Sequence, residues 1–159
     1  MTEDSESGKN EEKRIEEAQK WQAEAERSLA VAKAKEAHKL IEDTEKSRKR
    51  SAINSINSRM LKHGDRIVFI AGKLVELRSR SPDYKIASYF RSNIEDIMKV
   101  YESIRYDLMK TLEIKEEELE KLFPRISLDF GDVLETVSKL HCIVYQMHDM
   151  MSYCDRILK

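Results

Sequence analysis

The sequence contains few of the residues that break helices or form tight turns. Of its 159 residues, four are glycine and two are proline, whereas an average protein contains roughly 7% glycine and 5% proline. β-Sandwiches and α/β folds place these residues at many of their turns. The scarcity therefore argues against such folds and favours long helices.

Cysteine and long apolar runs are scarce as well. Cys142 and Cys154 are the two cysteines, which is too few for a disulfide framework and favours a reducing compartment. No run of 18 apolar residues is present, so we expect no membrane span. The first residues are acidic and polar, whereas a signal peptide has a cationic start and an apolar centre. We therefore expect an intracellular protein of the cytoplasm or the nucleus.

Charged residues are abundant and unevenly distributed. They make up 37% of the chain, whose net charge is −1. Residues 1–47 hold nine basic and thirteen acidic residues, residues 48–110 hold fourteen and seven, and residues 111–159 hold six and ten. A basic segment between acidic flanks can indicate an anionic partner. It can equally indicate helices that neutralise one another when packed, and we favour this interpretation.

High charge with few breakers predicts an all-α protein. Residues 1–10 hold no apolar residue except Met1, so we expect a disordered acidic tail. Residues 11–50 are rich in strong helix formers but carry only a thin, alanine-rich apolar stripe. We expect a helical, coiled-coil arm over residues 11–50. It should lead into an antiparallel bundle of about three helices over residues 51–159.

A heptad pattern begins after the basic cluster at residue 50. Its members alternate at steps of three and four, the a/d register of a coiled coil: Ile53, Ile56, Met60, His63, Ile67, Ile70, Leu74 and Leu77. We call these residues the heptad seam. Further apolar residues beside it widen the face and favour a bundle. We predict its apolar members as the contact surface for another helical protein or a second copy, and Gly64 leaves open whether one helix or two carries it.

Later boundaries follow from helix-end signals. Ser81-Pro82-Asp83 predicts a helix start, because serine caps, proline suits the first turn and aspartate complements the helix dipole. A short helix should end at Phe123-Pro124, followed by a linker over residues 125–132. The regular apolar spacing that begins at Val133 predicts a last, well-buried helix from about Asp132 to Leu158.

Six cations form the strongest electrostatic feature: Arg48, Lys49, Arg50, Arg59, Lys62 and Arg66. A basic helix face can follow a phosphate backbone. A small nucleic-acid-binding regulator that uses the basic 48–66 face is therefore our alternative function. The structural interpretation is that Arg59 and Arg66 occupy g positions, where charges flank the seam and pair with acidic neighbours.

Motifs for catalysis or cofactor binding are absent from the sequence. There is no P-loop, GxGxxG, GxSxG or HExxH. His141 and His148 lie seven residues apart, about 10.5 Å along a helix, so we interpret the histidines as core or boundary residues and the cysteines as buried thiols. We expect no enzyme, metal, cofactor or small-molecule substrate. The predicted function is a non-catalytic interaction protein, a subunit, scaffold or adaptor of a larger helical or coiled-coil assembly.

Overall fold

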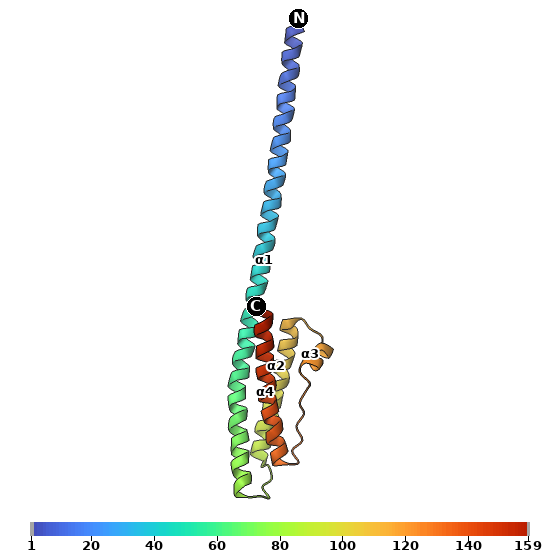
Figure 1. The fold of residues 1–159 in the computed structure, drawn as a ribbon. Coiled ribbons are helices and arrows are strands. Elements are labelled where there is room, and N and C mark those ends of the chain that lie inside the picture. Colours follow the sequence, from blue (N-terminus) through green and yellow to red (C-terminus); the bar gives the residue numbers. More distant parts are fainter. Residues whose placement is uncertain (1, 159) are drawn as a thin grey trace. The chain divides into compact units, whose positions relative to one another are not determined.

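The computed structural model describes the backbone of residues 2–158 and the side chains of residues 6–158. Over this range the chain is all-α, as predicted, with four helices and no strand (Figure 1). The helices are α1 (Thr2–Arg80), α2 (Ser88–Leu112), α3 (Glu116–Leu122) and α4 (Val133–Leu158). Within these bounds, no helix combines the length and the hydropathy that a membrane crossing requires.

The chain divides into two compact units, Met1–Ser47 and Arg48–Lys159. In the first unit, which we call unit 1, every side chain described from Glu6 to Ser47 is exposed. Helix α1 begins at Thr2, within the segment whose composition predicts disorder, and Met1 lies outside the described residues. The physical reason is that residues 2–10 contain no proline, so a helix formed by the following strong helix formers propagates into them at low cost.

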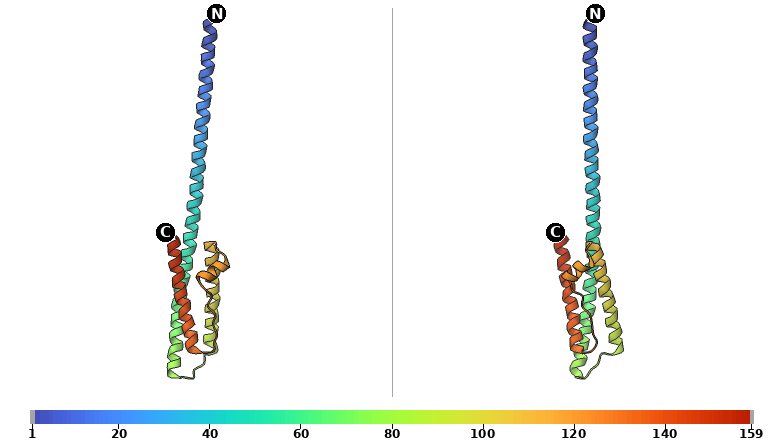
Figure 2. Two further views of the ribbon diagram at one scale, coloured as in Figure 1. Left: turned by 45° about the vertical axis from the view of Figure 1, so that its right-hand side comes forward. Right: turned by 90° about the vertical axis from the view of Figure 1, so that its right-hand side faces the viewer.

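The second unit, unit 2, is a three-helix bundle with one short extra helix. Residues 48–80 of α1 lie alongside α2 and α4, and both of these run antiparallel to α1 (Figures 1 and 2). Helices α2 and α4 run parallel to each other, because residues 123–132 carry the chain back along the bundle. The predicted bundle is therefore confirmed, with one parallel pair of helices within it.

Helix α1 continues through Gly64 without a break. The sequence alone leaves open whether one helix or two carries the heptad seam. Gly64 is buried, and a Cβ added there would lie 4.0 Å from Cγ1 of Val144 on α4. The helix tolerates this glycine at a cost of roughly 1 kcal/mol relative to alanine. One helix therefore carries the whole heptad seam.

The predicted helix start at Ser81-Pro82-Asp83 is wrong, because α2 begins at Ser88 with Ala87 as its N-cap. The N–H of Tyr84 instead donates to the carbonyl of Ser81 at 3.0 Å and closes a turn. Proline at the second position of such a turn is as favourable as at a helix start. Sequence signals alone do not separate the two uses.

The later boundaries agree with the predictions. Helix α3 ends just before Phe123-Pro124, and α4 starts at Val133. Asp132 caps α4, since its carboxylate accepts the N–H of Leu134 at 3.2 Å. Helix α2 ends at Leu112, and its C-cap Glu113 adopts the left-handed conformation (φ 56°). The N–H of Ile114 donates back to the carbonyl of Met109.

A single hydrophobic core holds unit 2 together. It contains buried residues of α1 between Ile53 and Leu74, of α2 between Ile94 and Leu112, and of α4 between Val133 and Cys154. Leu119 of α3, and Ile86 and Phe123 from the connections, complete it. Core burial at about 25 cal/mol per Å² of apolar surface is the main stabilising contribution to such a bundle.

Candidate interaction surfaces

The predicted partner surface, the heptad seam, lies in the core of unit 2. Its buried apolar members are Ile53, Ile56, Met60, Ile67, Ile70 and Leu74, and Leu77 is half-buried. They pack with α2 and α4 of the same chain. The assignment of these residues to an external partner is therefore corrected. The physical reason is that an a/d pattern requires an apolar neighbour but does not specify which chain supplies it.

His63, the one polar member of the seam, is also buried. Its Nε2 donates to the carbonyl oxygen of Ile97 on α2 at 3.3 Å. Burial lowers the pKa of His63 below its ordinary value, and the charges of Arg66 and Arg59 act in the same direction. The neutral imidazole thus links α1 to α2 inside the core.

Two of the six predicted cations are bound to α2. Arg59 donates to the carboxylate of Asp107 and to the hydroxyl of Ser103 at 3.1 Å. Arg66 donates to the amide oxygen of Asn93 at 3.0 Å. The predicted pairing with an acidic neighbour is confirmed for Arg59, whereas Arg66 contacts an amide. These two side chains serve helix packing in the structure.

The other four cations form no ion pair within 4.0 Å in the described part of the chain. Arg48, Arg50 and Lys62 are exposed, and Lys49 is half-buried. The surface open to an anionic partner is thus smaller than the sequence suggests.

Unit 1 exposes large apolar side chains along its helix. Ile15, Trp21, Leu29 and Leu40 are 57%, 74%, 56% and 68% exposed. Because successive helical residues lie about 100° apart, one side of the helix collects most of them together with three alanines. We call this side the N-terminal apolar face; its residues are Ile15, Ala18, Trp21, Ala25, Leu29 and Ala32.

Unit 2 has an apolar hollow between α1 and α4. Leu61 and Val68 on α1 are about half exposed, at 54% and 51%. Val144 and Met151 on α4 are half-buried, and the hollow beside Gly64 has a volume of about 100 Å³. This hollow is smaller than typical ligand pockets, whose volumes are roughly 300–1,000 Å³.

A buried arginine that was not predicted as a functional residue links α3 to the bundle. Arg105 on α2 is 2% exposed and donates to the carbonyl of Phe123 at 2.6 Å and to the carboxylate of Glu120 at 3.0 Å. It also lies 3.4 Å from the hydroxyl of Tyr101 and from the side-chain oxygen of Gln146. The signal in the sequence is a charged residue inside an apolar stripe, four residues after a tyrosine.

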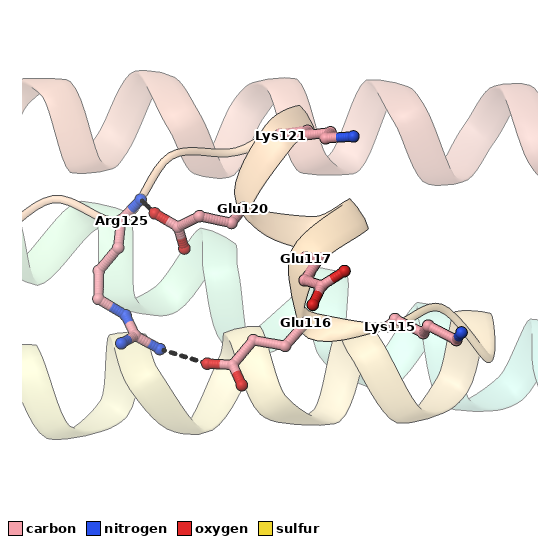
Figure 3. Close-up of a pocket in the computed structure, with 6 residues that line it drawn as sticks. All are labelled: Lys115, Glu116, Glu117, Glu120, Lys121 and Arg125. Atoms are coloured by element: carbon pink, nitrogen blue, oxygen red, sulfur yellow. Dashed lines mark hydrogen bonds and ion pairs between the residues drawn. The ribbon is translucent and has the colours of Figure 1, made fainter.

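Charged side chains line a larger hollow beside α3 (Figure 3). Its volume is about 640 Å³, and its lining residues are Lys115, Glu116, Glu117, Glu120, Lys121 and Arg125. The backbone N–H of Arg125 donates to Glu120 at 2.8 Å, and its guanidinium pairs with Glu102 and Glu116 at 3.1 and 3.6 Å. The balanced charge and these internal pairs indicate a solvated surface that stabilises the α3 turn.

The two cysteines lie in different environments, although both are predicted to be buried. Cys142 is exposed and Cys154 is buried. Burial raises the pKa of the Cys154 thiol to about 11, and the charge of Asp155 adds to the effect. Within residues 6–158, no three histidine, cysteine or acidic side chains lie close enough together to hold a metal ion.

Comparison of the chain with family models, with curated proteins and with solved structures yields no match. The candidate surfaces for function come from the geometry described above. They are the N-terminal apolar face, the hollow between α1 and α4, and the four cations without ion pairs.

Proposed function

We propose that this chain is a non-catalytic interaction protein, a subunit or adaptor that joins a larger helical assembly. The observation that carries the proposal is the N-terminal apolar face. All of its side chains are exposed in the structure, and contiguous apolar surface of this kind marks sites of association.

The energetics of the helix support this proposal. The alanines of the face bury little area within one chain, so packing inside the monomer contributes little to the stability of unit 1. A partner helix would bury Ile15, Trp21 and Leu29, each worth about 1.5–3 kcal/mol when taken out of water. Trp21 is also the residue type that most often dominates binding energy at interfaces.

A matched pair of substitutions tests the proposal. Ala25 lies on the N-terminal apolar face, whereas Ala23 lies on the opposite side of the same helix. Tagged full-length chains with Ala25→Glu or Ala23→Glu would be expressed in cells and purified, and the recovered proteins identified by mass spectrometry. We expect Ala25→Glu to lose partners, including second copies, that the native chain and Ala23→Glu retain. Equal recovery with all three chains would contradict the proposal.

The four cations without ion pairs support the alternative, a nucleic-acid-binding regulator. They lie in a segment, residues 48–110, with fourteen basic and seven acidic residues. Binding to RNA or DNA should weaken steeply with salt, and Arg48→Glu with Arg50→Glu should abolish it. No binding of the native chain at low salt would contradict this alternative.

We also propose an intracellular location, in the cytoplasm or the nucleus. Both cysteines are free, and free thiols persist in reducing compartments. Imaging of a fluorescent fusion in living cells would test this, and signal confined to a secretory compartment would contradict it.

A further inference from the structure

Charged residues continue the N-terminal apolar face at both of its ends. Glu11 and Arg14 precede Ile15, and Glu36 and Lys39 follow Ala32. All four lie on the same side of the helix as the face, because each is four or seven residues away from a member of the face. Any helix that covers the face therefore also meets these four charges.

The four charges disfavour a parallel pair of identical helices. In a parallel, in-register dimer each residue faces its own copy, so Glu36 would meet Glu36 and Lys39 would meet Lys39. Such like-charge contacts at seam positions are repulsive. Glu11 and Arg14 would add two further repulsive contacts.

In an antiparallel pair centred on Ala25, each of these charged residues lies level with a residue of opposite charge. In that arrangement a residue n lies level with residue 50−n of the partner. Glu11 then lies level with Lys39, and Arg14 with Glu36, twice each because the dimer is symmetric. All four contacts become attractive.

The same register also matches five of the six residues of the face with one another; the sixth, Ile15, lies level with Lys35. Ala25 meets its own copy, Ala18 meets Ala32, and Trp21 lies level with Leu29. Small residues at the centre let the two helix backbones approach closely. The two Trp21–Leu29 contacts then lie on either side of the central Ala25 contact, and the Ala18–Ala32 contacts lie beyond them.

We infer that the partner of the N-terminal apolar face is a second copy of this chain, bound antiparallel about Ala25. This inference rests on the proposed function and names the occupant of that face. The paired stretch covers residues 11–39, about 42 Å of helix. It ends before unit 2 begins at Arg48, so it leaves the core of the bundle unchanged.

Cysteine cross-linking tests the orientation directly. Full-length chains would carry Cys142→Ser, to remove the exposed thiol, together with Ala18→Cys, Ala32→Cys or Ala25→Cys. We expect Ala25→Cys to cross-link alone under mild oxidation. Ala18→Cys and Ala32→Cys should cross-link when mixed and not when separate, because residues 18 and 32 meet only between antiparallel copies. Cross-linking of each variant alone would show a parallel pair, and no cross-link with any of them would show no pair; both overturn the inference.

Charge reversal provides an independent test that introduces no cysteine. Glu11→Lys and Lys39→Glu should each weaken the dimer about tenfold, because each alters two symmetric contacts. The double variant should restore native affinity, since the pair is inverted rather than lost. Glu16→Lys, on the opposite side of the helix, serves as the matched control and should have no effect. Analytical ultracentrifugation of the full-length chains gives the dissociation constants, and failure of the double variant to recover would overturn the register.

The two proposals fail in distinguishable ways. If the native chain is monomeric in ultracentrifugation but Ala25→Glu still loses a different protein in the purification test, the antiparallel dimer is wrong and the interaction function stands. If Ala25→Glu changes neither self-association nor recovery of other proteins, both proposals fail. Circular dichroism of each variant confirms that unit 2 remains folded.

Discussion

Residues 6–47 and residues 48–158 use the same helical periodicity for different purposes. In unit 1 half of the repeating positions on the N-terminal apolar face are alanine, and every described side chain is exposed. In unit 2 they are isoleucine, leucine and methionine, and most are buried among three helices. The volume of the side chains at the repeating positions thus separates a helix whose side chains stay exposed from one that builds a core.

The two regions can be observed separately by spectroscopy. Trp21 is the single tryptophan and lies in unit 1, whereas all six tyrosines lie in unit 2. Tryptophan fluorescence therefore reports on unit 1, and the near-ultraviolet circular dichroism of tyrosine reports on unit 2. Each prediction below pairs a change in one unit with a matched change in the other.

The largest contrast is expected from truncating one apolar side chain in each unit. Ile67 is fully buried, so Ile67→Ala should lower the free energy of unfolding of unit 2 by about 2–5 kcal/mol. Leu29→Ala should change it by less than about 0.5 kcal/mol, since Leu29 is 56% exposed. Urea unfolding followed by tyrosine dichroism measures both. Similar losses for the two variants would remove the distinction between the units.

A smaller contrast is expected for arginine. Arg105→Met removes the donor to the carbonyl of Phe123 and to one of the two carboxylate oxygens of Glu120, which should cost unit 2 about 1–3 kcal/mol. Arg27→Met, in exposed unit 1, should leave the unfolding midpoint of unit 2 unchanged. Unit 2 retaining full stability with Arg105→Met would show that the buried network is dispensable.

The two units should also differ in their response to acid. Because burial lowers the pKa of His63 in the folded state, the unfolded chain binds this proton first as the pH falls below about 6.5. The stability contributed by the neutral side chain is present above that pH and is lost as the pH falls towards the folded-state pKa. His63→Met should flatten this part of the stability profile, whereas His38→Gln in unit 1 should not. Urea midpoints between pH 7.5 and 5 measure the difference, and an unchanged profile with His63→Met would contradict the assignment.

The smallest contrast concerns glycine within α1. A Cβ added at Gly72 or at Gly8 meets nothing within 4 Å, so alanine at either position should favour the helix by about 0.5–1 kcal/mol. Gly72→Ala should raise the unfolding midpoint of unit 2. Gly8→Ala should raise only the helicity of unit 1, measured by far-ultraviolet circular dichroism. A shift of the unit 2 midpoint by Gly8→Ala would show that the units unfold together.

Much of the architecture followed from local patterns. The bundle, the α3 boundary at Phe123-Pro124 and the start of α4 near Asp132 could be predicted because apolar spacing and helix-end signals act over a few residues. The start of α2 could not. A serine-proline pair suits both a helix start and a turn, and the turn forms where Ile86 is buried in the core.

The candidate surfaces were less predictable than the fold. The heptad spacing from Ile53 to Leu77 identified residues that pack, but not that their neighbours belong to the same chain. The sequence predicts Arg59 and Arg66 as contacts for an anionic partner, but in the structure both donate to side chains of α2. Contacts of this kind join residues more than 25 positions apart, and no local signal encodes them.

The amino-acid order alone was sufficient to specify an all-α chain with an alanine-rich first helix and an apolar second half, because helix propensity and periodicity are properties of neighbouring residues. Only the packed structure decided which apolar face is used internally and which stays exposed. It also revealed Arg105 as a buried link to α3. Burial depends on which helices meet, and that choice is made by the volume and charge of distant side chains together.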